Sequence, residues 1–218
     1  MKVFIGYDPR QPISYNVLQH SIVSRSSKPV SITPLIINQL PIERMGLTPF
    51  TFTRFLVPWL CDYKGWALFL DLDMLVLDDI SKLFDMADDK YQVMVSKNTK
   101  RFEWASAMLF NCAECKVLTP EYVETAKGLH AIEWAERIGS LPSEWNHLVG
   151  YDAKRPDAKL VHYTQGIPAF PETKGCEYTD EWFKEHRIVN SAVSWAELMG
   201  NSVHSEIVNG KPKPKLAM

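Results

Sequence analysis

Residues 65–80 read GWALFLDLDMLVLDDI, an apolar run that two acidic residues, Asp71 and Asp73, interrupt. Its apolar part does not alternate with polar side chains. That pattern predicts a strand at residues 66–73 that is buried on both faces, as in sheets covered by helices on either side. A buried carboxylate costs free energy unless it is paired, hydrogen-bonded or bound to a metal. The two aspartates must therefore either cap a turn or hold a ligand.

Strand-like and helix-like segments alternate along the rest of the chain, which predicts an α/β fold with a mostly parallel sheet and helices on both faces. Strands are expected at residues 2–8, 30–37, 66–73, 91–96, 106–112 and 158–164, and helices at residues 13–26, 52–60, 79–86 and 119–129. A length of 218 residues fits one compact domain. We place that domain at residues 1–208 and expect residues 209–218, which are rich in Pro and Lys, to form a loose tail.

Composition narrows the class of protein. The net charge of −2 provides no basic field for nucleic acid. No window approaches the ~18 apolar residues of a membrane span. The first residues are too short for a signal peptide, so we expect a cytoplasmic protein with reduced cysteines. Cys112 and Cys115 form a single C-x-x-C, which is weak evidence for zinc. The Lys-rich tail is read as solvated, with contact to a membrane surface as the alternative.

Three predicted strands end in side chains that can hold a ligand. They are Asp8, then Asp71 and Asp73, then His162. In open α/β sheets, ligands bind beyond the carboxyl ends of the strands. Carboxylates suit hard cations such as Mg²⁺ and Mn²⁺, and a cation held this way can neutralise a departing diphosphate. The spacing alone leaves the alternative that both aspartates cap the following turn. No glycine-rich phosphate-binding loop is present.

Four segments resemble a known family. They are VFIGYD at residues 3–8, the long run at residues 53–84, LPSEWN at residues 141–146 and LVHYTQGIPAF at residues 160–170. In this order they resemble the nucleotide-sugar glycosyltransferases of the GT-A fold, in particular glycosyltransferase family 8 and its small bacterial relatives. The resemblance implies a single GT-A-like domain. It also implies a metal-dependent, hexosyltransferase-type enzyme that moves a sugar from a nucleotide-diphosphate donor to a glycan or other small acceptor with retention of configuration.

The resemblance also implies roles for individual residues. Asp71 and Asp73 are expected to bind Mn²⁺ or Mg²⁺ through a D-x-D motif, with His162 as the third ligand. Imidazole ligation suits Mn²⁺ better than Mg²⁺. Arg54 matches the family arginine that reaches the D-x-D carboxylates and the donor sugar, although it could instead pair with Asp62. Arg54 and Asp73 are thus the expected catalytic residues.

Donor and acceptor contacts follow from the same resemblance, with a UDP-sugar as the favoured donor. Asp8 is expected to contact the nucleobase, with Tyr7 stacking on it. Lys174 is a candidate for the diphosphate. The candidates for the acceptor side are Trp104, Trp145 and Asn146.

The sequence departs from the family at three motifs, and two other functions stay open. The family's K-P-W lysine, its N-A-G-V and its D-Q-D-x-L-N have no clear counterparts. A nucleotide-sugar-binding protein without turnover is therefore one alternative. A haloacid-dehalogenase-type phosphatase is another, because it also carries D-x-D after a strand. That class needs the motif on its first strand, with Thr or Val where Leu75 stands here.

Overall fold

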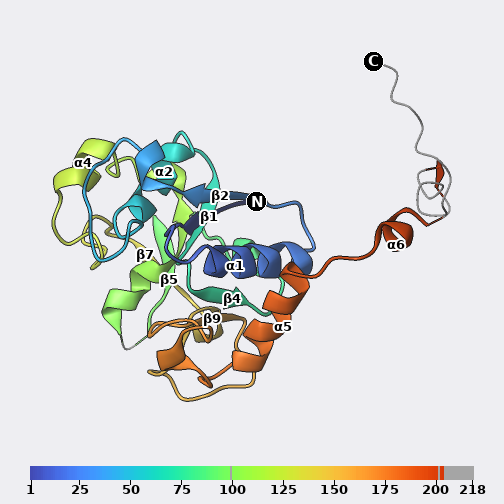
Figure 1. Ribbon diagram of the computed structural model, residues 1–218. Coiled ribbons are helices and arrows are strands. Elements are labelled where there is room, and N and C mark those ends of the chain that lie inside the picture. The colour runs from blue at the N-terminus through green and yellow to red at the C-terminus, as the bar shows by residue number, and fades with distance from the viewer. Residues whose placement is uncertain (99, 201, 204–218) are drawn as a thin grey trace.

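The computed structural model describes residues 1–98, 100–200 and 202–203 of the chain. Two sheets form its centre (Figure 1). The larger has the order β2-β1-β3-β6-β5-β7 and the smaller has the order β4-β9-β8. The strands of the large sheet are β1 (Lys2–Gly6), β2 (Ser31–Leu35), β3 (Trp66–Leu70), β5 (Val93–Ser96), β6 (Ala107–Asn111) and β7 (Ile138–Leu141). Those of the small sheet are β4 (Met74–Val76), β8 (His147–Leu148) and β9 (Leu160–His162).

The large sheet is mixed. Strand β1 pairs in parallel with β2 and β3, and β5 pairs in parallel with β7, whereas β6 runs antiparallel to both β3 and β5. In Figure 1, α2 and α4 lie on one side of these strands and α1 on the other. The helices are α1 (Pro12–Arg25), α2 (Val57–Leu60), α3 (Ser81–Asp85), α4 (Pro120–Thr125), α5 (Thr179–Val189) and α6 (Trp195–Met199). The predicted α/β class with a mixed, mostly parallel sheet is confirmed.

Helix α1 joins the two sheets through its buried face. Its buried residues, Ser14, Val17, Leu18, Ser21 and Ile22, recur at steps of three or four and so lie on one face. The helix packs against β4 and α5. The Ser21 hydroxyl donates to the carbonyl of Leu18 at 2.8 Å and accepts from the amide of Val76 at 3.1 Å. A polar side chain therefore ties the helix to the small sheet without leaving a buried donor unpaired.

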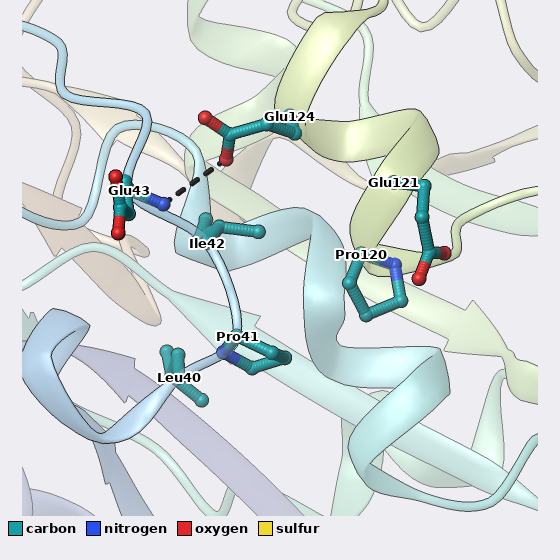
Figure 2. Close-up of a pocket in the computed structure, with 7 residues that line it drawn as sticks. All are labelled: Leu40, Pro41, Ile42, Glu43, Pro120, Glu121 and Glu124. Carbon is teal, nitrogen blue, oxygen red and sulfur yellow. Dashed lines mark hydrogen bonds between the residues drawn. The ribbon is translucent and has the colours of Figure 1, made fainter.

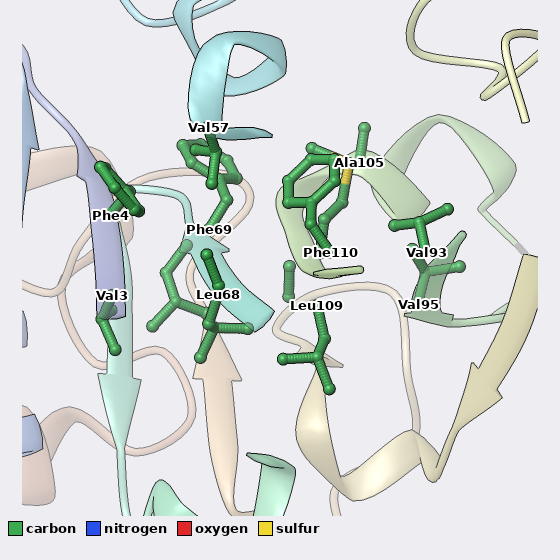
Figure 3. Packing of buried hydrophobic residues seen from close by; sticks show 14 of the residues in the cluster. Val3, Phe4, Val57, Leu68, Phe69, Val93, Val95, Ala105, Leu109 and Phe110 are labelled. Carbon is green, nitrogen blue, oxygen red and sulfur yellow. The ribbon is translucent and has the colours of Figure 1, made fainter. Parts of the chain in front are cut away.

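The core of the large sheet is made of side chains from its central strands. Figure 3 shows residues of β1, β3, β6 and β5 side by side, including Phe4, Phe69 and Phe110. Residues 67–70 are completely buried, as the absence of alternation predicted. Burying one side chain of this size stabilises the fold by roughly 1.5–3 kcal/mol. Strand β3 is therefore a rigid support for whatever follows its last residue.

Several predicted boundaries differ from the structure. The strand expected at residues 2–8 ends at Gly6, so Asp8 lies beyond it, and the helix expected at residues 119–129 ends at Thr125. Another difference matters for the site. The strand expected at residues 66–73 ends at Leu70, and residues 71–73 are not strand. The chain turns there because Met74 pairs with His162 in the small sheet rather than continuing along β6. The sequence analysis also did not predict β4, β7, β8, α5 or α6.

Two further expectations concern the periphery of the molecule. Among the described helices, none has the length and apolar character needed to cross a lipid bilayer. The predicted tail at residues 209–218 lies outside the described residues.

Candidate metal and donor site

The two aspartates lie at the crossing from the large sheet to the small one. The amide of Asp71 donates to the carbonyl of Ser106 beside β6, at 2.9 Å. The carbonyl of Asp73 accepts from the amide of Tyr163 just after β9, also at 2.9 Å. Leu72 between them is completely buried. The backbone of Asp71 is therefore bound beside the large sheet and that of Asp73 beside the small sheet, with the buried Leu72 between them.

His162 completes a group of three potential metal ligands. It is the last residue of β9, which runs antiparallel to β4 and brings it beside Asp73. One ligand atom each from Asp71, Asp73 and His162 lies within 4.8 Å of the other two. The His162 Nε2 atom is 3.4 Å from Asp73 Oδ1. Among the described residues, the strand ends thus bring together the three side chains that the resemblance named.

Arg54 lies on the 3₁₀ turn Thr53–Leu56 and faces the same group. Its Nη2 is 2.9 Å from Asp71 Oδ1, and both side chains are about nine-tenths buried. Its Nη1 donates to the carbonyl of Ala105 at 2.8 Å and its Nε to that of Thr51 at 3.1 Å. Asp62, the alternative partner, instead pairs with Lys64. The guanidinium is therefore fixed next to the D-x-D motif.

Negative charge dominates the site. Burial raises the pKa of Asp71 to about 7, although Arg54 acts in the opposite direction. Burial also raises the pKa of Glu103, a carboxyl that faces His162. Burial would lower the pKa of His162, but Asp73 outweighs it and the pKa is raised. Repulsion among carboxylates is what a divalent cation removes.

The donor chemistry fits such a cation. Carboxylate oxygens and an imidazole nitrogen form a ligand set suited to Mn²⁺. Asp71 Oδ1 is buried, and although Arg54 Nη2 lies 2.9 Å away in the ion pair, it receives no well-oriented hydrogen bond. The three residues open onto a cavity of about 310 Å³. Its wall includes Thr48, Phe50 and Thr51 from the loop before Arg54, together with Thr164 after β9.

Two titratable residues of the cavity wall were missed by the sequence analysis. Glu103 lies on the 3₁₀ turn Arg101–Ser106, and no motif marked it. His130 lies edge-on to the rings of Phe52 and Phe55. Burial and the charge of Arg54 lower the pKa of His130 to about 4, so its ring is neutral at pH 7. No local pattern announces either residue, because tertiary contacts alone bring them to the cavity.

Other candidates lie away from the cavity wall. The Asp8 carboxylate is fully buried and accepts hydrogen bonds from the backbone, Nε and Nη2 of Arg10. Tyr7 packs edge-on against Tyr15, with 5.7 Å between ring centres. Lys174 is exposed. None of Tyr7, Asp8 and Lys174 is among the residues that line the 310 Å³ cavity.

The acceptor-side candidates differ from one another in burial. Trp145 is completely buried, so its ring has no face open to a sugar here. Asn146 is also buried, and its Nδ2 donates to the carbonyl of Glu103 at 3.3 Å and to Ser106 Oγ at 3.0 Å. Trp104 is partly exposed, and its indole donates to the carbonyl of Asn98 at 3.0 Å. Asn146 therefore contacts the segment that carries Glu103.

A second cavity, of about 430 Å³, has different chemistry. Figure 2 shows it between the segment around Ile42 and α4. Its polar side chains are Glu43, Glu121 and Glu124, and Glu124 is already engaged by the amides of Glu43 and Arg44. No lysine or arginine lines this cavity. Its lining therefore provides no positive charge for a diphosphate.

Comparison with known proteins gives a relative and several structural neighbours. No family model matches the chain. Protein CDI of Arabidopsis thaliana is 41% identical over 222 aligned positions, which cover 84% of this chain and 85% of the relative.

The structural neighbours are glycosyltransferases at low identity. The apo bifunctional glycosyltransferase WbbM superposes with a TM-score of 0.68 at 15% identity, over 96% of this chain and about half (51%) of that one. The galactosyltransferase LgtC, in complex with donor and acceptor sugar analogues, superposes with a TM-score of 0.62 at 12% identity, over 90% of this chain and 99% of LgtC. GlyE of Streptococcus pneumoniae superposes with a TM-score of 0.61 at 16% identity, over 86% of this chain and 62% of GlyE. The chain therefore belongs to the family of Protein CDI and has the GT-A glycosyltransferase fold.

Proposed function

We propose that this protein is a divalent-metal-dependent glycosyltransferase of the hexosyltransferase type, using a nucleotide-diphosphate sugar, with a UDP-sugar favoured. The observation that supports this proposal most strongly is that Asp71, Asp73 and His162 lie together at one cavity of a GT-A fold. Arg54 beside them supplies fixed positive charge. These are the groups that a leaving nucleotide diphosphate requires.

Each residue has a role that its position supports. Asp71, Asp73 and His162 would hold Mn²⁺ or Mg²⁺, which when bound neutralises the phosphates of the leaving nucleotide. Arg54 holds Asp71 in place and adds charge where negative charge develops. Asp73 is the most exposed of the three ligands, with a quarter of its side chain accessible, so it can meet a ligand in the cavity. We assign no nucleophile, and retention of configuration rests on the resemblance.

The test compares the unaltered protein with Asp73→Ala. We expect Mn²⁺-dependent release of nucleotide from one member of a panel of UDP-, GDP- and CMP-sugars, and at least a 10-fold loss in the variant. Asp157→Ala is the matched control, since Asp157 is exposed and paired with Arg155. Equal Mn²⁺-dependent turnover in the unaltered protein and Asp73→Ala would refute the metal role.

A nucleotide-sugar-binding protein without turnover is the second candidate. It is favoured by the lining of the 310 Å³ cavity, which contains no lysine in place of the missing K-P-W lysine. Donor binding in calorimetry, together with no nucleotide release across an acceptor panel, would support it. The phosphatase alternative is not supported, because Asp71 follows β3 rather than the first strand and the fold is GT-A.

The cytoplasmic location remains a prediction. The four cysteines, Cys61, Cys112, Cys115 and Cys176, are free thiols, which suits a reducing compartment.

A further inference from the structure

Glu103 lies on the opposite side of the His162 ring from Asp73. Its Oε2 is 3.6 Å from His162 Nδ1, whereas His162 Nε2 is 3.4 Å from Asp73 Oδ1. The His162 side chain is 3% exposed and that of Glu103 is 15% exposed. The imidazole is therefore enclosed between two carboxylates, one on the side of the proposed metal and one behind it.

The backbone of Glu103 is fixed by buried groups. Its amide donates to the carbonyl of Lys100 at 2.8 Å. Its carbonyl accepts from Ser106 Oγ at 2.6 Å and from Asn146 Nδ2 at 3.3 Å. Ser106 and Asn146 are both almost completely buried. The carboxylate thus extends from an anchored turn, and its position facing His162 is set by the fold.

The way in which a histidine binds a metal suggests a role for a carboxylate at the position of Glu103. A neutral imidazole that binds a cation through one nitrogen carries its proton on the other, and an acceptor there sets both the tautomer and the ring orientation. His162 Nδ1 is buried without a hydrogen bond in the structure, and the group that faces it is Glu103. The 3.6 Å separation of these two atoms exceeds a hydrogen-bond distance by only a few tenths of an ångström.

We propose that Glu103 is a positioning residue for His162: it accepts a hydrogen bond from Nδ1–H and so aims the Nε2 lone pair at the space between Asp71 and Asp73. This role rests on the proposed metal-dependent function. Glu103 is not itself a ligand in this scheme, since it lies on the Nδ1 side of the ring. Removing the Glu103 carboxylate is expected to weaken the binding of the cation although all three ligands are still present.

The experiment measures Mn²⁺ affinity directly, by electron paramagnetic resonance of free Mn²⁺ titrated with the full-length protein. The variants are Glu103→Met, His162→Ala and the double substitution, with Glu103→Gln as the conservative variant. We expect Glu103→Met to weaken Mn²⁺ binding about 10- to 100-fold, as losing such a partner typically does. Glu103→Gln should lose less, because its amide oxygen can still accept from Nδ1–H. In the His162→Ala background, Glu103→Met should have no further effect. Met has a similar length without an oxygen acceptor, and thermal unfolding without metal checks that the fold is intact.

The matched control is Glu114→Met. Glu114 is 45% exposed, pairs with Arg137 and follows the far end of β6. This substitution removes the same charge and should leave Mn²⁺ affinity unchanged. Equal affinity for Glu103→Met and the control would overturn the positioning role, as would a full additional loss from Glu103→Met in the His162→Ala background. If the unaltered protein binds no Mn²⁺, the proposed function fails together with this inference.

Discussion

Replacing Asp71 by Asn should stabilise the metal-free protein. Burial raises the pKa of Asp71 to about 7 from an ordinary value of 3.8, a difference of about 3 units. One unit corresponds to about 1.4 kcal/mol, so the ionised carboxylate costs the folded state up to about 4 kcal/mol. Asn has nearly the same shape and carries no charge. The substitution should therefore recover most of that free energy at a pH where Asp71 is ionised.

The pH dependence has a defined sign. Because the folded-state pKa of Asp71 is above the unfolded value, the folded protein binds more protons between about pH 4 and pH 7. The contribution of Asp71 to the free energy of unfolding therefore falls as pH rises from about 4 to about 7. Asp71→Asn should raise the free energy of unfolding by about 2 kcal/mol at pH 5 and about 4 kcal/mol at pH 7.5.

The assay is urea unfolding at pH 5 and pH 7.5 in the presence of a chelator. Adding Mn²⁺ should stabilise the unaltered protein by mass action and leave Asp71→Asn unchanged. Asp79→Asn is the control of opposite sign. Burial would raise the pKa of Asp79, but hydrogen bonds from Ser27 and Ser81 outweigh it and lower the pKa. The reasoning is refuted if Asp71→Asn is no more stable than the unaltered protein at pH 7.5, or if its advantage does not grow with pH.

Two further changes test the charged groups. Arg54→Met removes the counterion of Asp71, whose pKa is already about 7, so the carboxyl takes up a proton instead of staying charged. We therefore expect the loss in urea unfolding to be about 1 kcal/mol larger at pH 7.5 than at pH 5; an equal loss at both pH values would contradict this. Glu185→Gln should cost about 2 kcal/mol at pH 7. Burial raises the pKa of Glu185, but hydrogen bonds from Arg25 and His20 outweigh it and lower the pKa. Its contribution is therefore present above about pH 4.5 and is lost as pH falls from there through the lowered folded-state pKa, so the unfolding curves of the two proteins should converge as the solution is acidified.

The sequence predicted those parts of the fold that local patterns determine. The non-alternating run at residues 67–70 indicated a strand buried on both faces, and the spacing in α1 indicated a helix. Strands β4, β8 and β9 have two or three residues each. Their existence depends on pairing between distant segments, which leaves little trace in a local pattern. For the same reason the end of β3 at Leu70 was missed.

The candidate site shows the same difference between residues that a local pattern marks and residues that only tertiary contacts bring into place. Asp71, Asp73 and His162 were singled out because each stands at the end of a predicted strand and matches a motif of the family, and the structure brings them together across the junction of the two sheets. Glu103 and His130 were missed because 3₁₀ and loop segments bring them to the cavity through contacts that are distant in sequence. Trp145 shows a limit of a different kind. The resemblance made it a candidate for the acceptor side, but no local pattern showed that tertiary packing buries its side chain completely.

The division of the D-x-D motif between two sheets has a mechanical consequence. Asp71 is anchored to the large sheet, while Asp73 and His162 are anchored to the small one. A cation held by all three would act as a cross-link, and any shear of one sheet against the other would change its coordination. If a ligand in the cavity draws the sheets together and so raises the affinity for the cation, reciprocity requires that the cation raises the affinity for that ligand by the same factor. In such a protein, occupancy of the cavity and stiffness of the sheet junction change together.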